Sequence, residues 1–202
     1  MPGELTTTIL QQQTVVGNWL KTLPFNQFDP TLGTLLNIRV SIADQVNGSV
    51  AMENLGPAVA TMTAPLSGMV SVTGPAQISL GSSGGGAPVT LQLAGFDGMV
   101  DFAGGSGALA SNVSGSGTTD FTHAATNPSF AAFVGQGTID LTASGLVTNT
   151  LVSGGGSFRL QSSANIGAVI GLQYQYEVPA PVGGGGGSSG SGFTNVITNA
   201  PR

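Results

Sequence analysis

The stretch NWLKTLPFNQFDPTLGTLLNIRVSIADQVNGSVAMEN, residues 18–54, decides the fold of this chain. From Leu36 to Ile42 the even positions are apolar and the odd positions are polar. A period of two is typical of a β-strand with one face in water. The dipeptide Asn47-Gly48 tolerates the positive φ angles of a type I′ turn, and the alternation resumes beyond it. The sequence therefore predicts a β-hairpin that turns at Asn47-Gly48.

The same alternation recurs along the chain, most clearly from Ile166 to Val178. A strand of this length reaches roughly 40 Å at about 3.3 Å per residue and belongs in the middle of a sheet. The residues expected to face the core are Leu36, Ile38, Val40, Ile42, Ile170, Leu172 and Tyr174. Many short alternating segments separated by turn signals, without a 3.6-residue period, predict an all-β fold. The architecture expected is a β-sandwich or a jelly roll with extended terminal segments.

Several segments are expected to interrupt the strands. Pro65 should divide residues 59–72 into two short strands, because proline cannot donate to a central ladder. The run GSSGGG at 81–86 predicts a flexible loop. Residues 104–119 are almost wholly Gly, Ser and Ala, which favours a surface excursion with at most weak strands. The phenylalanines expected to return to the core after it are Phe121, Phe130 and Phe133.

The chain divides into three parts by composition. Residues 1–16 form a Thr-rich and β-branched N-terminal strand, and residues 17–182 form the sandwich domain. Residues 183–202 are a Gly/Ser-rich tether followed by the strand-like tail FTNVITN.

Charge and composition exclude several classes of function. Only 6% of the 202 residues are charged, against about 25% in ordinary globular domains. The net charge is −5 and the basic residues are scattered, so no basic patch exists to bind nucleic acid. The absence of Cys excludes disulfides, thiolate catalysis and Cys-based zinc sites. No run reaches the 18 or more apolar residues expected of a membrane span. The N-terminal segment lacks the basic and apolar regions of a signal peptide, which leaves the export route open.

No catalytic constellation is evident. His123 is the only imidazole, and its neighbours offer no nucleophile or orienting carboxylate, so a surface or structural role is expected. Asp97 and Asp101 are the calcium candidates because hard oxygen ligands suit that ion, although no EF-hand pattern surrounds them. The glycine runs lack the Lys and Ser/Thr of a phosphate loop. We expect a protein that is not an enzyme and has no cofactor.

Two segments carry a family resemblance. GNWLKTLPFNQFDPTLGTLLNIRVSI, residues 17–42, and VNGSVAMENLGPAVATMTAPLSGMVSVTGP, residues 46–75, resemble the choice-of-anchor E domain family of exported bacterial proteins. FDGMVDF and FVGQGTIDLTAS agree more loosely with later segments of that family. The resemblance implies an exported, β-rich domain, usually followed by a sorting anchor. The tail FTNVITNAPR departs from that pattern because it contains no apolar anchor helix.

The function expected is that of an extracellular or cell-surface bacterial structural protein that self-assembles into fibres. A terminal strand, either Leu5–Val16 or Phe193–Thr198, would complete the sheet of the next copy. The N-terminal strand is favoured because it is longer, whereas the C-terminal one has the better tether. The residues expected to make this contact are Leu5, Thr7, Ile9, Val15, Phe193, Val196 and Ile197. The partner is another copy of the chain, with extracellular polysaccharide as a further candidate.

The alternative is a surface adhesin or glycan-binding module. Such a module stacks sugars on exposed aromatic side chains, and Trp19, Tyr174 and Tyr176 are the candidates here. Their strand and corner settings favour core packing over a sugar platform. An enzyme is the third hypothesis.

Overall fold

The computed structural model describes residues 3–5, 11–16, 18–149, 152–153 and 156–179. Two five-stranded antiparallel sheets make up this part of the chain, which confirms the all-β sandwich prediction. Sheet A contains β1 (Gly3–Leu5), β2 (Gln11–Val16), β4 (Thr34–Asn54), β7 (Gly107–Ala124) and β10 (Phe158–Glu177). Sheet B contains β3 (Trp19–Asn26), β5 (Ala60–Thr73), β6 (Ser79–Leu93), β8 (Thr138–Asn149) and β9 (Val152–Ser153). Three 3₁₀ helices lie between strands: η1 (Pro30–Leu32), η2 (Pro75–Gln77) and η3 (Pro128–Phe133).

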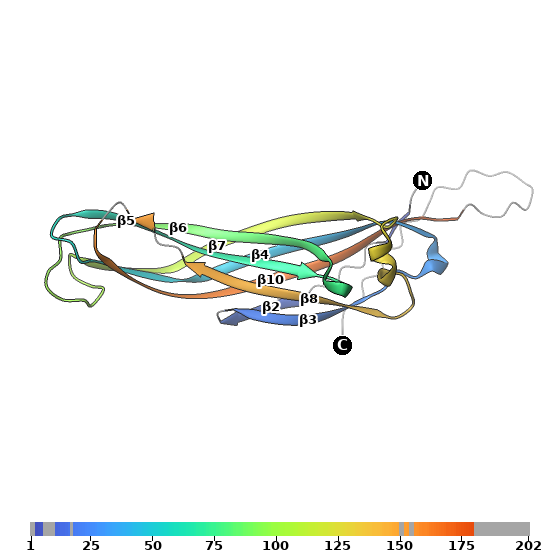
Figure 1. The fold of residues 1–202 in the computed structure, drawn as a ribbon, viewed down its shortest axis with the longest axis horizontal. Helices are drawn as coiled ribbons and strands as arrows, with labels where there is room; N and C mark the ends of the chain where they lie inside the picture. The colour runs from blue at the N-terminus through green and yellow to red at the C-terminus, as the bar shows by residue number, and fades with distance from the viewer. Residues whose placement is uncertain (1–2, 6–10, 17, 150–151, 154–155, 180–202) are drawn as a thin grey trace, which may run out of the picture.

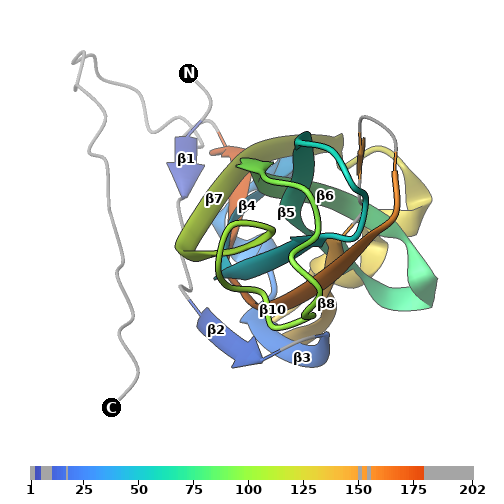
Figure 2. The same cartoon turned by 90° about the vertical axis from the view of Figure 1, so that its left-hand side faces the viewer.

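The long strands set the shape of the molecule. β4 has 21 residues and β10 has 20, so each spans roughly 65 Å at about 3.3 Å per residue. Figure 1 shows the resulting elongated body, and Figure 2, which looks along it, shows the strands arranged around a common interior. The strand order is β1–β10–β4–β7 in sheet A, with β2 also on β10, and β3–β8–β5–β6 in sheet B, with β9 on β5. β10 therefore lies inside its sheet, as its alternation predicted.

The apolar core divides into two clusters along the long axis. The first is the larger and includes Trp19, Leu23, Phe25, Phe28, Ile38, Val40, Ile42, Val70, Val72, Phe130, Phe133, Leu141, Ile166, Ile170, Leu172 and Tyr174. The second contains Val46, Val50, Met52, Met62, Ala64, Leu66, Val89 and Leu93. Even positions of β4 and β10 face inward in both, because successive side chains of a strand alternate between the two faces of a sheet.

The predicted hairpin at Asn47-Gly48 is wrong. β4 runs straight through this dipeptide, with Asn47 opposite Asn165 and Gly48 opposite Ala164 on β10. A Cβ at position 48 would collide with the backbone of Ser163 and Ala164. The pairing of β4 with β7 also shifts register between Gly48 and Val50. The glycine is therefore required for close strand contact at a β-bulge, and not for the φ angle of a turn.

Leu36 was expected in the core, and the structure corrects this. It is half-buried, whereas Leu35 packs against the first cluster. The register between β4 and β10 slips between Gln175 and Tyr176, so Tyr176 pairs with Leu35 and Leu36 is left out of the ladder. One extra residue in a strand reverses the face of those before it. The other six residues predicted to face inward are buried.

Pro65 does not break its segment, contrary to prediction. β5 is continuous, and Pro65 lies opposite Pro88 on β6. On its other edge, the described pairs of β5 are with β9 at Met62 and Thr63, and with β8 from Leu66 onward. On that edge Pro65 thus lies between the residues that pair with β9 and those that pair with β8. Its missing N–H therefore interrupts no described strand pair there.

The two glycine-rich segments are also strands, so the flexible loop predicted at 81–86 and the prediction of at most weak strands at 104–119 are wrong. Residues 81–86 lie within β6, and 107–119 lie within β7. A Cβ on Gly115 would collide with the backbone of Gly86, and one on Gly117 would lie 2.6 Å from the Gly84 carbonyl oxygen. The edge strands of the two sheets approach so closely here that side chains do not fit between their backbones. Small residues are needed for this contact.

The aromatic residues fall largely where the sequence placed them. Phe130 and Phe133 are buried at η3, and Phe121 is half-buried against the first cluster. The chain turns a corner at Phe28-Asp29-Pro30, where the Asp29 carboxylate accepts hydrogen bonds from the Thr31 N–H and hydroxyl. These hydrogen bonds hold the pKa of Asp29 below its ordinary value.

Candidate assembly edge and binding face

The outer edge of β10 is the first candidate site, because among the described residues only the N-terminal strands pair with it. β1 pairs antiparallel with β10 from Gly3 opposite Tyr176 to Leu5 opposite Tyr174. β2 pairs with the same edge from Gln11 opposite Ile170 to Val16 opposite Asn165. β4 occupies the other edge of β10 along its whole length. The N-terminal segment is thus an added edge strand on a sheet that is otherwise continuous.

The predicted assembly residues are only partly within the described structure. Leu5 lies in β1 and Val15 lies in β2, where it is opposite Ile166. Thr7, Ile9, Phe193, Val196 and Ile197 lie outside the described residues. The described backbone of the N-terminal candidate pairs with β10 of the same chain.

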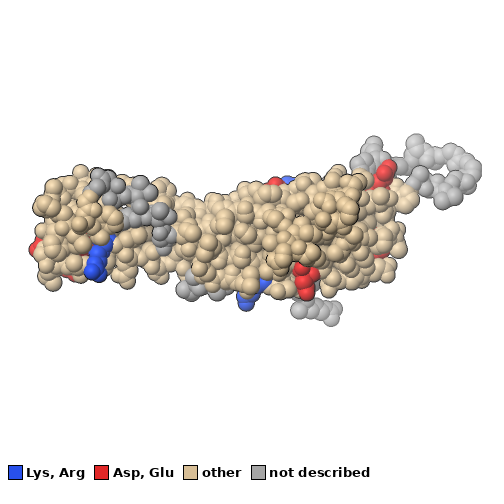
Figure 3. Space-filling model, in the orientation of Figure 1, with Lys and Arg blue, Asp and Glu red and all other residues tan. Residues whose placement is uncertain are grey.

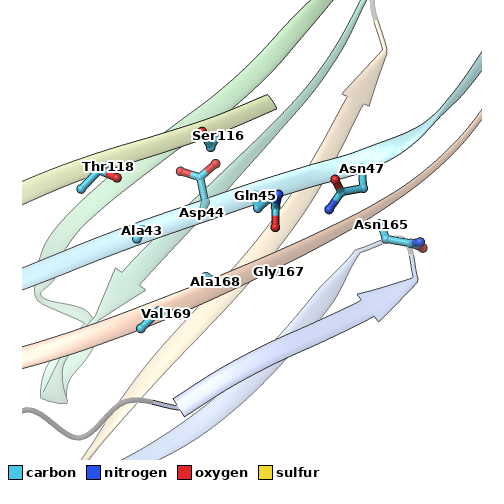
Figure 4. A pocket seen from close by; sticks show the side chains of 10 residues that line it. All are labelled: Ala43, Asp44, Gln45, Asn47, Ser116, Thr118, Asn165, Gly167, Ala168 and Val169. Carbon is cyan, nitrogen blue, oxygen red and sulfur yellow. The ribbon is translucent and has the colours of Figure 1, made fainter. Parts of the chain in front are cut away.

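The outer face of sheet A is the second candidate site. Three shallow hollows of about 300, 310 and 320 Å³ follow one another along β4, β7 and β10. Side chains of the central hollow include Gln45, Asn47, Ser116, Thr118 and Asn165, which are drawn in Figure 4. The face is lined mainly by amides and hydroxyls, and no aromatic ring lines the central hollow. Such a surface offers many hydrogen-bond donors and acceptors with little charge.

This face carries one ion pair. Arg39 on β4 donates from Nη2 to Oδ2 of Asp120 on β7 at 2.9 Å, and both side chains are about half exposed. Beside it, the Asn37 amide donates to the Gln175 side chain at 2.8 Å. An exposed pair of this kind contributes about 0.2–1 kcal/mol of stability and is weakened by salt. Figure 3 shows how few charged side chains the visible surface carries.

The aromatic residues considered as a sugar platform mostly lie in the core. Trp19 is buried and donates its indole N–H to the carbonyl of Ile166 at 2.9 Å. Tyr174 is buried and donates its hydroxyl to the carbonyl of Asn26 at 2.8 Å. Burial raises the pKa of the Tyr174 phenol, so this hydroxyl remains a donor at neutral pH. Tyr176 is half-buried, with its ring 5.3 Å from that of Phe28. These contacts match the core packing that the sequence favoured.

His123 links the two sheets. Its Nε2 lies 3.0 Å from the carbonyl oxygen of Leu80 on β6, and its ring stacks on Phe130 with centroids 5.0 Å apart. These two contacts give the imidazole a structural role.

The calcium candidates each cap a local turn. Asp97 accepts the N–H of Met99 at 3.0 Å, and Asp101 accepts the N–H of Ala103 at 2.9 Å. Nearby, the buried Glu53 accepts the Ser106 hydroxyl at 2.6 Å and the Phe102 N–H at 2.7 Å, which anchors the same loop. Across the described residues, no group of three or more His, Cys, Asp or Glu side chains comes together. Sequence reasoning missed Glu53 because its loop partners are 49 to 53 residues away.

Sequence reasoning also missed Asp44, although a signal was present. Asp44 occupies an even position of β4, between the buried Ile42 and Val46, where the alternation calls for an apolar residue. It is 3% exposed, and neither carboxylate oxygen has a hydrogen-bond partner. A polar residue that breaks a strict alternation marks a position worth testing for function.

Comparisons with known proteins assign no family. No family model matches the chain, and no curated protein matches it. Among solved structures, the chain is similar to that of the infectious bursal disease virus Gx strain, with 6% identity, a TM-score of 0.19, and coverage of 89% of this chain and 36% of that chain. The VP2 subviral particle of the same virus gives 10% identity, a TM-score of 0.22, and coverage of 88% and 38%. The chain spans less than two fifths of these proteins, and similarity at such scores carries no argument about function.

The described helices are all short 3₁₀ turns, and none is long and apolar enough to cross a membrane.

Proposed function

We propose that this protein is a structural component of an extracellular matrix or cell surface, and that copies assemble into fibres by exchanging their N-terminal strands. The observation that carries the proposal is the isolation of β1 and β2 at the edge of sheet A. Their described backbone pairing is with β10 alone. The same edge of β10 in the next copy accepts the same strand without any new contact surface.

The connection to the rest of the chain favours exchange. Only residues 17 and 18 separate the end of β2 from the start of β3. A short connection between an edge strand and the body is the setting in which strands swap between copies. Each copy then donates one strand and accepts one, and such a head-to-tail contact propagates into a filament.

Two further properties support a homopolymer. With 6% charged residues, neighbouring copies repel one another weakly even at close range. The exchanged strand also covers the edge of β10, which would otherwise present unpaired N–H and C=O groups to any other chain. Assembly of this kind protects the edge while it joins the copies.

The test is a pair of truncations imaged by negative-stain electron microscopy. Deleting residues 1–13 should abolish the filaments formed by the full chain, because most of the donor strand is lost. Deleting residues 182–202 is the matched control and should leave filaments intact. Filaments from both truncated proteins would refute exchange of a terminal strand. Loss of filaments only in the C-terminal truncation would assign the donor to Phe193–Thr198.

Complementation in trans separates a missing donor from a damaged fold. A synthetic peptide of residues 1–16 should bind the protein that lacks residues 1–13 at one peptide per copy and raise its melting temperature. The control peptide carries proline at both Gln12 and Gln13. Ladder hydrogen bonds fall on alternate residues, so two consecutive prolines remove at least one donor whichever residue faces β10. Equal binding of the two peptides would contradict backbone pairing on β10.

A glycan-binding module is the second candidate, and the hollows on the outer face of sheet A favour it. Amide side chains such as Gln45 and Asn47 match the hydroxyl groups of a polysaccharide. The variant Gln45→Ala/Asn47→Ala should lower affinity for a bound polysaccharide at least tenfold in a pull-down or calorimetric titration. Gln92→Ala, at an exposed position of sheet B, is the control. Unchanged affinity in the double variant would remove this face from consideration.

A further inference from the structure

Asp44 is the most anomalous side chain in the described structure. It lies on the inward face of β4, and Figure 4 shows its carboxylate between the β4 and β7 ribbons. The position falls between the two apolar clusters, because Ile42 belongs to the first and Val46 to the second. Although Asp44 also borders the central hollow of sheet A, its side chain points away from the outward-facing Ala43 and Gln45. The carboxylate therefore belongs to the interior.

Glycine backbones pack closely around this carboxylate. A Cβ on Gly85 would lie 2.6 Å from Oδ1 of Asp44, and a Cβ on Gly117 would lie 2.7 Å from Oδ2. The Cβ placed on Gly117 would also lie 2.6 Å from the carbonyl oxygen of Gly84. Two oxygen acceptors, one of them a carboxylate, thus converge where β4, β6 and β7 meet. Only glycine fits at positions 85 and 117 beside these oxygens.

A second buried oxygen lies on the facing strand. Ser83 is 2% exposed, and its hydroxyl has no hydrogen-bond partner. Ser83 lies two residues before Gly85 on β6, and both residues face inward. Their Cα atoms are therefore about 7 Å apart, and Gly85 is the residue that packs against Asp44. Two buried, unpartnered polar side chains therefore face the same strip of the interior from opposite sheets.

We propose that this strip binds a hard metal cation through the Asp44 carboxylate, with the Ser83 hydroxyl and the Gly84 carbonyl as further oxygen ligands. An ionised carboxylate without a partner is strongly disfavoured in a protein interior. Among the described residues, no Lys or Arg forms an ion pair with it. Carboxylate, hydroxyl and carbonyl oxygens are the ligands that hard cations such as Na⁺ and Ca²⁺ prefer. A cation would balance the charge of Asp44 and tie β4 to β6 at the junction of the two clusters.

Thermal unfolding tests the proposal. The full chain is melted in chelator-treated buffer with choline chloride, and then at equal ionic strength with NaCl or with CaCl₂. One of the two cations should raise the melting temperature saturably, by roughly 5 °C or more at a hundred times its Kd. Asp44→Asn should abolish this shift, and Ser83→Ala should weaken it at least threefold in apparent affinity. In cation-free buffer, Asp44→Asn should melt above the wild type because it removes an unpaired buried charge.

Two controls make the outcome decisive. Asp140→Asn removes an exposed strand carboxylate and should keep the full cation response. The double variant Asp97→Asn/Asp101→Asn should also keep it, because those carboxylates lie in a separate surface loop. The proposal is overturned if neither salt shifts the wild type, or if Asp44→Asn responds as the wild type does. Loss of the response only in the Asp97/Asp101 variant would place the cation in that loop and would equally overturn it.

Discussion

Replacing Ile170 by Asp should lower the free energy of unfolding by about 4 kcal/mol or more. Ile170 lies on β10 opposite Ile42, is 1% exposed, and belongs to the larger apolar cluster. The substitution removes a packed aliphatic group and places a charge without a partner in its position. The melting temperature should fall by roughly 10 °C or more, measured by circular dichroism or calorimetry.

Gln161→Asp is the matched control for this substitution. Gln161 lies on the same strand at an exposed odd position, so the same new charge remains in water there. Its melting temperature should stay within a few degrees of the wild type, since surface substitutions usually change stability by about 0.5 kcal/mol or less. An unchanged melting temperature for Ile170→Asp would mean that β10 faces the core with its odd residues, one register away from the structure described here.

Gly85→Ala should destabilise the protein by about 2–3 kcal/mol, although it adds a single methyl group. The new Cβ would lie 2.6 Å from Oδ1 of Asp44 and 2.7 Å from the backbone carbonyl carbon of Ser116. The backbone cannot move away without breaking the pairing of β6 with β5 or of β7 with β4. The expected fall in melting temperature is roughly 5–10 °C.

The neighbouring Gly84→Ala provides the control. A Cβ at position 84 would meet only the carbonyl oxygen of Gly68, at 3.4 Å, which is an ordinary contact. Its stability should stay close to that of the wild type. Equal stability of the two variants would indicate a flexible loop at residues 81–86, as the sequence predicted, and would contradict a strand packed against β7.

The face that β4 and β10 turn inward could be predicted from the sequence. Ile38, Val40 and Ile42 alternate with polar residues, and burial of one face leaves a single register that satisfies this pattern. Phe130 and Phe133, expected to return to the core after the segment rich in Gly, Ser and Ala, are buried as well. The prediction failed at Leu36, because a bulge opposite Gln175 and Tyr176 leaves no signature in the alternation itself.

The candidate sites were predicted less fully. The N-terminal strand was recognised as a β segment from its Thr and β-branched residues. Its partner could not be predicted, because pairing with β10 joins residues 149 to 159 positions apart. Asp44 was visible as a break in the alternation of β4. Its lack of a partner depends on β6 and β7, which lie far from it in the sequence.

By itself, the sequence determined an all-β chain with little charge, and it determined which face of each patterned strand is buried. Only the tertiary structure decided that Asn47-Gly48 continues a strand and that residues 81–86 and 107–119 are strands. The physical reason is that a strand is recognised in sequence by side chains that alternate, and glycine has none. Positions 48, 85 and 115 require glycine because the backbone of another strand occupies the space that a Cβ would fill. In each case that strand comes from a distant part of the chain.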